Sequence, residues 1–414
     1  MKEGDDMATY TSEPLNILHT IGFKELYPVI RCQLDFEGPL DVLQLVRALT
    51  QVTKIIPQLL CRYDLPHNRW QSTTATAAEL IYTDVANPDA DAAGLDWEKG
   101  PQLRCYLQTG PTSQLIIYLS HILTDGAGAK ALLQLIAQAY NGQPLMIANR
   151  QDVGWLYDLK ARVGKPDTTT TDNRDHPSQP LSLPALATAK TASRQRYVGQ
   201  QTLSVAVTQR LLQAAHQSGV TLNDIIMACF GRAIQRFRPV KTIALACPTD
   251  LRRYAPPATG VVRIANHTAR YNVAINSPVT DSINQTVHLM HNAMAEAKAH
   301  YQFFDSIAAL LTQVQQHTDL TDLQQLVEKN YHVRPIAYTN FGIVAEDKIQ
   351  FNHCPLQRVV LTGSFRTAPM FQIAASTFKS QLTIAFNMIG TPDEYHFGMA
   401  ITASVADLMR QFCE

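Results

Sequence analysis

The stretch from Gln114 to Tyr140, QLIIYLSHILTDGAGAKALLQLIAQAY, constrains the fold more than any other part of the sequence. Residues 115–119 form an apolar, β-branched run, which predicts a buried strand. From Ala129 to Tyr140 the apolar residues recur at helical spacing, and Asn141-Gly142 ends the predicted helix. A strand therefore delivers His121 into a tight, glycine-containing turn from which a helix leaves.

The residues of this turn allow proton transfer. A neutral imidazole has an unperturbed pKa of about 6.5, so His121 can act as a base near neutral pH. Asp125 can orient the ring or brace the loop that carries it, and Gly126 keeps the approach open for a bulky ligand. The same pattern also fits a histidine that fills a loop and an aspartate that caps the next helix. The residues alone leave both interpretations open.

The segment from Ser120 to Gly126, SHILTDG, resembles the His-His-x3-Asp-Gly signature of a superfamily of acyl-transferring enzymes. This superfamily contains peptide-synthetase condensation domains, polyketide-associated acyltransferases, alcohol acetyltransferases and the plant BAHD enzymes. The first histidine of the signature is Ser120 here, whereas the second, which the family uses as a base, is present as His121. The resemblance implies an α/β (α+β) fold of two chloramphenicol-acetyltransferase-like subdomains. Each would be a mixed β-sheet with packed helices, and the two would form a V around a central tunnel.

Weaker similarities extend over nearly the whole chain. Residues 57–63, PQLLCRY, resemble a condensation-domain element whose arginine pairs with the motif aspartate, which implies that Arg62 pairs with Asp125. Residues 100–104 and 219–224 resemble a segment before the motif strand and the start of a second-half helix, respectively. Residues 248–253, PTDLRR, resemble a turn of the same enzymes.

Two further sets of residues complete these similarities. In the turn at 248–253, Arg252 is expected to be structural rather than catalytic. Residues 336–342, IAYTNFG, resemble a strand and turn that face the cleft. This implies that Thr339 or Asn340 donates a hydrogen bond to a developing oxyanion. A turn-forming asparagine explains the same residues equally well.

Length and local composition divide the chain. The 414 residues are enough for two domains of about two hundred each. A stretch rich in Thr, Pro, Asp and Ser without periodicity predicts an exposed, mobile linker over 166–195, so His176 within it is not expected to be catalytic. We therefore expect an N-terminal subdomain over 1–165 that carries the motif. A C-terminal subdomain over 196–414 would contribute a crossover strand.

Composition excludes several classes of partner. Lys+Arg and Asp+Glu both number 35, which argues against a nucleic-acid partner or an anionic-membrane binder. The seven cysteines form no C-x-x-C pair, as expected in a reducing compartment. The acidic N-terminus is unlike a signal peptide, and no apolar run approaches the roughly 20 residues of a membrane span. We expect a cytoplasmic monomer.

The histidines at 288 and 291 share a helix face, so a metal site there is formally possible. No cysteine or acidic ligand is placed in sequence to complete it, and Glu296 is on a different turn. We therefore expect no metal.

The resemblance implies an acyltransferase that moves an acyl group from a CoA or carrier-protein pantetheine thioester to a hydroxyl or amine. His121 would be the general base, Asp125 would brace its loop through Arg62, and Gly126 would leave room for the pantetheine arm. Acyl-CoA or acyl-pantetheine would be the co-substrate, with no permanently bound cofactor. Two alternatives stay open. One is a free-standing condensation enzyme whose partner is an acyl or peptidyl carrier protein. The other is a catalytically inactive small-molecule- or partner-binding relative, which Ser120 would fit.

Overall fold

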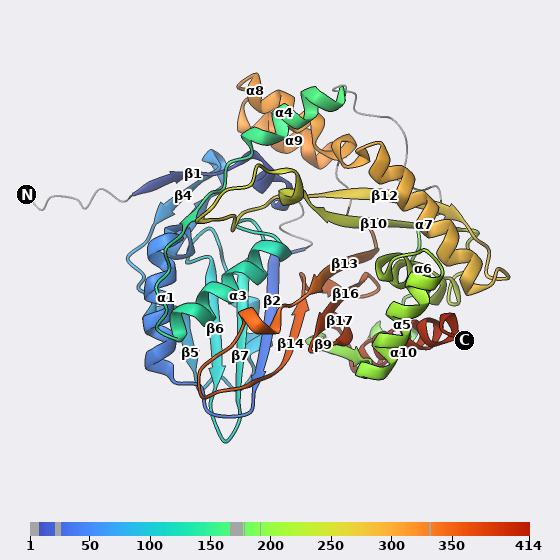
Figure 1. Cartoon of the computed structure of the whole chain (residues 1–414), viewed down its shortest axis with the longest axis horizontal. Helices are drawn as coiled ribbons and strands as arrows, with labels where there is room; N and C mark the ends of the chain where they lie inside the picture. The colour runs from blue at the N-terminus through green and yellow to red at the C-terminus, as the bar shows by residue number, and fades with distance from the viewer. Residues whose placement is uncertain (1–7, 21–25, 166–176, 178, 191, 331–332) are drawn as a thin grey trace, which may run out of the picture.

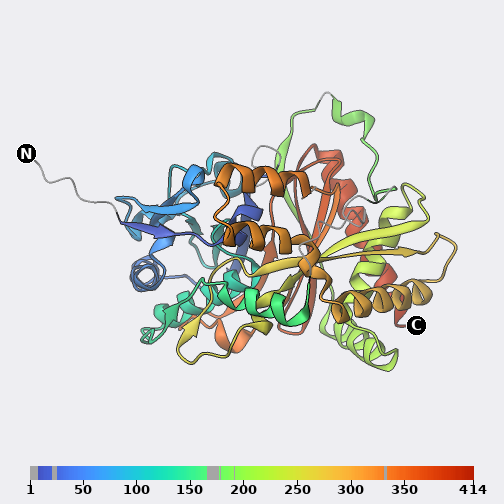
Figure 2. The same ribbon diagram turned by 90° about the horizontal axis from the view of Figure 1, so that it is seen from above.

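The computed structural model describes residues 8–20, 26–165, 177, 179–190, 192–330 and 333–414. Two groups of strands and helices lie side by side, one coloured mainly blue to cyan and the other mainly green to red (Figure 1). Each group contains a five-stranded sheet with helices packed on it. Seen from above, α8 (Ala308–Gln315) and α9 (Leu320–Asn330) lie over the region between the groups (Figure 2).

The sheet of the first half has the strand order β14-β2-β7-β6-β5. Its centre is the antiparallel pair β2 (Val29–Phe36) and β7 (Ser113–Ser120), and β7 is the strand predicted from the apolar run before His121. The helices α1 (Val42–Ile55) and α3 (Gly126–Tyr140) pack against each other beside this sheet (Figure 1). The motif thus lies at the junction of a central strand and a covering helix, as the sequence predicted.

The strand β14 (Leu356–Thr362) comes from the last fifth of the chain yet pairs antiparallel with β2 of the first half. Val359 and Leu361 of β14 are buried in the core of the first half. The chain then returns to the second half at β15 (Arg366–Thr367) and β16 (Phe371–Phe378). One strand of the second half therefore completes the sheet of the first.

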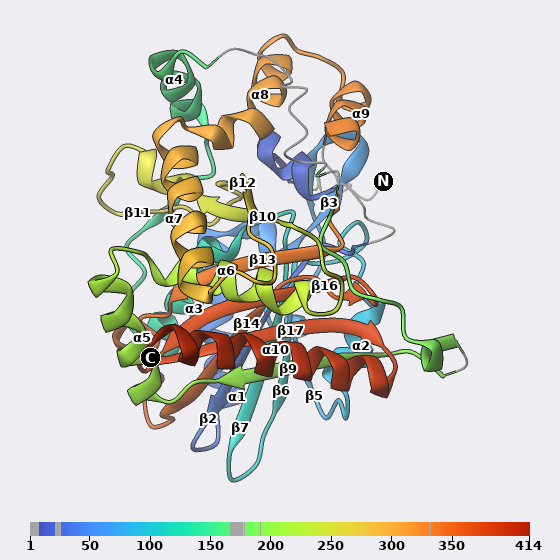
Figure 3. The same cartoon turned by 90° about the vertical axis from the view of Figure 1, so that its right-hand side faces the viewer.

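The main sheet of the second half runs β13-β16-β17-β15, and β9 also pairs with β17. The bounds of its remaining strands are β13 Ile336–Ile343, β17 Gln381–Gly390 and β9 Gln195–Thr202. Figure 3 shows α10 (Pro392–Phe412) crossing this sheet near β9 and β17. A separate antiparallel pair, β10 (Thr242–Asp250) and β12 (Thr268–Asn276), continues the second half towards the first.

Local signals set several helix boundaries. A capping box between Thr221 and Asp224 begins α6 (Leu222–Gln235), as predicted. The last helix, α10, begins at Pro392, where Thr391 and Glu394 form a second capping box. Proline is favoured at the first helical position, because its missing N–H would have no partner there.

The strand β9 ends at Thr202. Ser204 then accepts a hydrogen bond from the backbone N–H of Val207 and caps α5 (Val205–Gln217). The turn expected at residues 248–253 instead begins as the last part of β10 and continues into η7 (Leu251–Tyr254).

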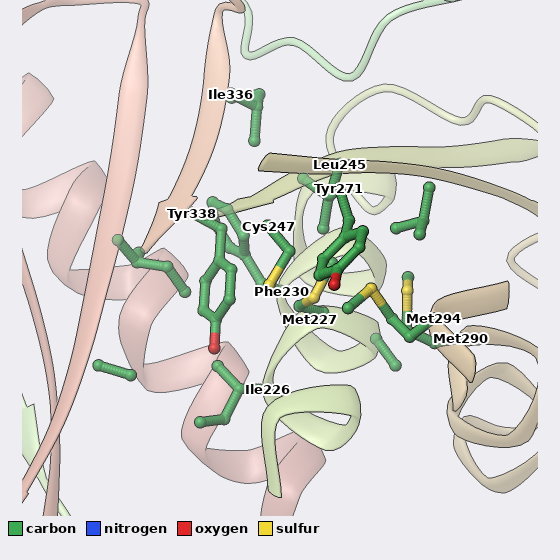
Figure 4. Packing of buried hydrophobic residues seen from close by; sticks show 14 of the residues in the cluster. Ile226, Met227, Phe230, Leu245, Cys247, Tyr271, Met290, Met294, Ile336 and Tyr338 are labelled. Carbon is green, nitrogen blue, oxygen red and sulfur yellow. The ribbon is translucent and has the colours of Figure 1, made fainter. Parts of the chain in front are cut away.

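Two clusters of buried residues form the core, and neither is confined to one stretch of sequence. The larger lies in the second half, where side chains of α6 pack between β10 and α7 (Ile283–Ala299) (Figure 4). It also takes in the apolar residues of η1 (Pro14–His19) and of α4 (Gly154–Val163). Early segments of the chain therefore pack into the second half.

Only part of the predicted linker over 166–195 lies among the described residues. Residues 166–176, including His176, lie outside the described residues. Leu181 and Leu183 are buried in the larger core cluster, so the expectation that this stretch is exposed is wrong at these two positions. Two apolar side chains, too few to show a periodicity, were enough to anchor it.

Two remaining strands, β6 Leu103–Gln108 and β5 Ile81–Thr83, complete the sheet of the first half. The other elements are short strands and helices that connect or flank the two main sheets. They are β1 Thr9–Thr11, η2 Pro57–Leu60, β3 Cys61–Asp64, η3 Leu65–His67, β4 Arg69–Ser72, η4 Ala78–Leu80, α2 Pro88–Asp91, η5 Ala92–Gly94, β8 Ala148–Asn149, η6 Ala187–Lys190, β11 Val261–Val262, η8 Gln302–Ser306 and η9 Glu346–Lys348.

Candidate active site

A cavity of about 210 Å³ lies where the two halves meet. From the motif it is lined by His121, Asp125 and Gly126. The rest of its wall comes from η1, β2, the β10–β12 pair, β13 and the segment after β14. The motif therefore faces a space that both halves enclose, which is what the sequence implied.

His121 follows the last residue of β7, and its half-buried ring is held from within its own loop. Its Nδ1 lies 3.0 Å from the carbonyl oxygen of Thr124. A carbonyl oxygen only accepts, so Nδ1 carries the proton and Nε2 of the neutral ring carries the lone pair. The main-chain oxygen of His121 accepts from Nδ2 of Asn266 at 2.7 Å, which fixes the loop from the second half.

Burial keeps this imidazole neutral. Desolvation lowers the pKa of His121, and the negative charge of Asp125 offsets only part of this effect. The ring therefore stays unprotonated near neutral pH. A neutral ring with Nε2 as its acceptor is the form that a general base needs.

Asp125 is 4% exposed and is the N-cap of α3. Its Oδ1 accepts from the backbone N–H of Gly128 at 2.9 Å, and its Oδ2 accepts from the backbone N–H of His267 at 2.7 Å. Nη1 of Arg252 lies 2.9 Å from Oδ2. Burial alone would raise the pKa of Asp125, but Arg252 and these N–H groups outweigh burial and lower it.

The expectation that Arg62 pairs with Asp125 is wrong. Arg62 lies on β3 and donates to the side chain of Gln71 on the neighbouring β4. The cation beside Asp125 is Arg252, the arginine that was expected to be structural rather than catalytic. Arg252 also donates to the main-chain oxygens of Arg263 and Ala265, so it ties three segments together.

The two glycines after Asp125 are needed for close packing. A Cβ on Gly128 would lie 2.0 Å from Oγ1 of Thr124, and a Cβ on Gly126 would lie 2.7 Å from the ring of Phe341. Gly126 thus lines the cavity, but the space beside its Cα is filled by an aromatic ring from β13.

Ser120, at the position of the first motif histidine, is fully buried and does not line the cavity. Its backbone N–H donates to the carbonyl oxygen of Gln102 at 2.9 Å. Ser120 therefore contributes no atom to the described cavity wall.

Thr339 and Asn340, the two candidate oxyanion donors, are separated by the structure. Thr339 lines the cavity, whereas Asn340 is exposed and is absent from the described cavity wall. The Nδ2 of Asn340 donates to Asn223 at 3.1 Å, and its Oδ1 accepts from the backbone N–H of Gly342 at 2.8 Å. The turn-forming interpretation fits Asn340, and Thr339 keeps the expected access to the site.

Sequence reasoning missed several residues of the cavity. His19, from η1, lies against His121, and the guanidinium-bearing residues of the wall are Arg270, Arg334 and Arg366. No local motif marked them, because their common position depends on how η1, β12 and the segments around β13 and β15 pack.

One histidine of the pair at 288 and 291 lies beside an acidic side chain. Nδ1 of His291 lies 2.8 Å from Oδ2 of Asp224, an acidic neighbour that spacing along the sequence did not reveal. No group of three or more His, Cys, Asp or Glu residues in the described ranges is arranged to hold a metal ion. His267 is fully buried and does not line the cavity.

Over the described part of the chain, no helix combines the length and apolar character that crossing a bilayer requires.

Comparisons with known proteins agree with this architecture. The model of a family described as "Condensation domain" matches residues 67–360, most of the chain. A protein of Mycobacterium tuberculosis (strain H37Rv), provisionally named a diacylglycerol O-acyltransferase, is 23% identical over 223 residues. That match covers 45% of each chain, so this chain spans less than half the length of the curated relative.

Three solved structures resemble nearly the whole chain. Trichothecene 15-O-acetyltransferase from Fusarium sporotrichioides gives a TM-score of 0.70 at 11% identity and covers 100% of this chain and 97% of its own. Polyketide synthase associated protein 5 from Mycobacterium tuberculosis gives a TM-score of 0.65 at 16% identity and covers 100% of this chain and 99% of its own. The first condensation domain of the calcium-dependent antibiotic synthetase gives a TM-score of 0.65 at 15% identity and covers 98% of this chain and 97% of its own. The expected fold of two chloramphenicol-acetyltransferase-like subdomains is thereby confirmed.

Proposed function

The chain belongs to the condensation-domain family, and from that premise we propose that it is an acyltransferase with His121 as its general base. The acyl group would come from a CoA or carrier-protein pantetheine thioester, and the acceptor would be an alcohol or an amine. The observation that carries this proposal is a neutral imidazole, with its lone pair on Nε2, in the wall of a cavity shared by the two halves.

The proposed reaction follows from this placement. Nε2 of His121 takes the proton of the acceptor O–H or N–H as the acceptor attacks the thioester carbonyl carbon. The tetrahedral oxyanion then collapses, the C–S bond breaks, and the proton passes from His121 to the leaving thiolate. General-base assistance of this kind contributes about 10²–10⁴-fold to the rate. Thr339 supports the proposal as a hydroxyl donor in the cavity wall for the oxyanion.

In this mechanism Asp125 does not touch the reacting atoms. Its carboxylate is occupied by Arg252 and by two backbone N–H groups, so it holds the motif loop. A carboxylate that faced the thioester would repel the oxyanion. An active enzyme is favoured over an inactive relative because His121 is in the cavity wall, whereas Ser120 is buried outside it.

The test is a panel of acyl-CoA and acyl-pantetheine thioesters of increasing chain length, each offered with alcohol and amine acceptors. We expect acceptor-dependent release of free thiol for a subset of pairs. The His121→Ala variant should lose about 10²-fold or more of that rate. It should keep the circular dichroism spectrum and melting temperature of the wild type. Equal thiol release by the variant and the wild type would refute the base role.

The donor is distinguished in the same experiment. Turnover with free acyl-CoA supports the CoA-dependent enzyme. Turnover only when the acyl group is loaded on a carrier protein supports the free-standing condensation enzyme.

A further inference from the structure

The ring of His19 stacks on the ring of His121. Their centroids are 4.1 Å apart and the two planes differ by 18°. Both residues line the cavity, and His19 is the last residue of η1, far from the motif in sequence. One face of the base is therefore covered by a second imidazole.

The position of His19 is determined by the packing of η1. Leu15, Ile17 and Leu18 of this short helix are buried in the core cluster of the second half, where η1 contacts α8 and α9. The turn after His19 is closed by Oγ1 of Thr20, which donates to the main-chain oxygen of Ile17 at 2.8 Å. His19 is thus held by the second half, whereas His121 extends from a strand of the first.

The charged groups around the stacked pair come from several elements. Asp125 lies beside His121 at the start of α3, and Arg252 from η7 balances its charge. His267 donates its backbone N–H to the same carboxylate. The remaining charged residues of the cavity wall are the arginines at 270, 334 and 366, and Glu13 stands at the other end of η1.

We propose that His19 is a positioning residue that fixes the ring plane of His121 and excludes water from one face of it. For its effect on turnover, this inference rests on the proposed function. The pKa of His19 is lowered well below its ordinary value, first by burial and then by the charge that His121 would carry. The pair therefore does not hold two protons, and His19 is a neutral, flat surface against which the base rests.

The decisive variants are His19→Ala and His19→Phe. Alanine removes the stacked ring and lets water reach His121, so the pKa of His121 should rise towards its ordinary value by on the order of half a unit or more. Phenylalanine preserves an aromatic surface without a titrating group, so the pKa of His121 should stay near that of the wild type. The measurement is an NMR titration of ¹⁵N-histidine-labelled protein, with the His121 signal assigned by its loss in His121→Ala.

Turnover provides the second readout. With an active acyl donor, His19→Ala should lose about 10-fold or more in kcat/KM at pH 7. The acidic limb of its profile of kcat/KM against pH should move to higher pH. His19→Phe should retain most of the rate and the wild-type profile. The exposed His300, at the end of α7, gives a matched control, and His300→Ala should change neither readout.

The inference is overturned if His19→Ala leaves both the titration of His121 and the pH profile unchanged. It is also overturned if His19→Phe behaves like His19→Ala, because the stacked surface would then not be what matters. The NMR titration needs no substrate. A protein that shows no transferase activity but a shifted His121 titration would therefore refute the proposed function and leave the stacking role intact.

Discussion

Asp125, at the start of α3, lies 2.9 Å from Nη1 of Arg252, which follows it by 127 positions in the chain. The motif carboxylate of one half is thus neutralised by a cation that stands at the end of a strand of the other. Both side chains are largely buried, with 5% and 16% exposure. The loop that carries His121 therefore keeps its shape only while the two halves are in contact.

We predict that Arg252→Ala is strongly destabilising, because it leaves a buried carboxylate without its cation. Removing one partner of such a pair costs about 3–5 kcal/mol. Arg62→Ala provides the matched comparison, since Arg62 bonds to Gln71 and not to Asp125, and it should cost about 1 kcal/mol or less. Urea denaturation of both variants measures the difference. Equal losses, or a larger loss for Arg62→Ala, would mean that the motif is braced differently.

A second prediction concerns Gly128. The alanine methyl of Gly128→Ala would lie 2.0 Å from Oγ1 of Thr124 and 3.3 Å from Nη2 of Arg252, so the loop must shift. We expect a loss of about 1–3 kcal/mol in unfolding free energy together with reduced turnover. Gly154→Ala, at the start of α4, meets nothing within 4 Å and should be neutral or slightly stabilising. Thermal unfolding and turnover of the two variants test this contrast directly.

The two residues considered as oxyanion donors should now behave differently. Thr339→Val removes a hydroxyl from the cavity wall and should lower kcat by about 10-fold or more, approaching the 10²–10³-fold known for oxyanion donors. Asn340→Ala removes an exposed amide bonded to Asn223 and should leave kcat close to the wild-type value. The kcat values of the two variants, measured with the same acyl donor, distinguish the two assignments. If kcat fell more for Asn340→Ala than for Thr339→Val, the assignment of the oxyanion donor to Thr339 would be wrong.

Stability should fall as the pH is lowered below about 6.5. The pKa of buried His267 is lowered to about 4, chiefly by desolvation and then by Arg252. Between the unfolded value near 6.5 and the folded value near 4, the unfolded chain binds more protons than the native one. Folding is therefore favoured at higher pH and weakened by roughly 3 kcal/mol towards pH 4 on account of this group.

Burial lowers the pKa values of His19 and His121 as well, so both add to the same trend. The measurement is urea denaturation at pH 7.5, 6.5, 5.5 and 4.5 for the wild type and for His267→Gln. The variant should show a flatter dependence. A variant with the same slope as the wild type would mean that His267 is not the group that titrates.

How far the sequence predicted the site depended on whether a residue's neighbours are local. His121, Asp125 and Gly126 lie together in one turn between a strand and a helix, so spacing and hydrophobic pattern placed them correctly. Arg62 was expected to be the cation beside Asp125 because residues 57–63 resemble a condensation-domain element whose arginine pairs with the motif aspartate. The true identity of this cation depends on how η7 meets the first half, which no local pattern encodes.

The fold shows the same division. The apolar periodicity that predicted α3 and the capping box that begins α6 act within a few residues. The packing of η1 into the second half, which brings His19 to the base, involves apolar residues too few to show a period. Long-range packing of short segments is the part that a single sequence did not predict.

The pairing of β14 with β2 has a consequence for how this protein can be divided. A fragment that ends before β14 would leave β2 at the edge of its sheet, with the six residues that pair with β14 exposed as a template for self-association. Neither half could therefore be excised or exchanged by itself, because β14, which comes late in the chain, completes the sheet of the first half. Recombination between relatives would have to carry both lobes together.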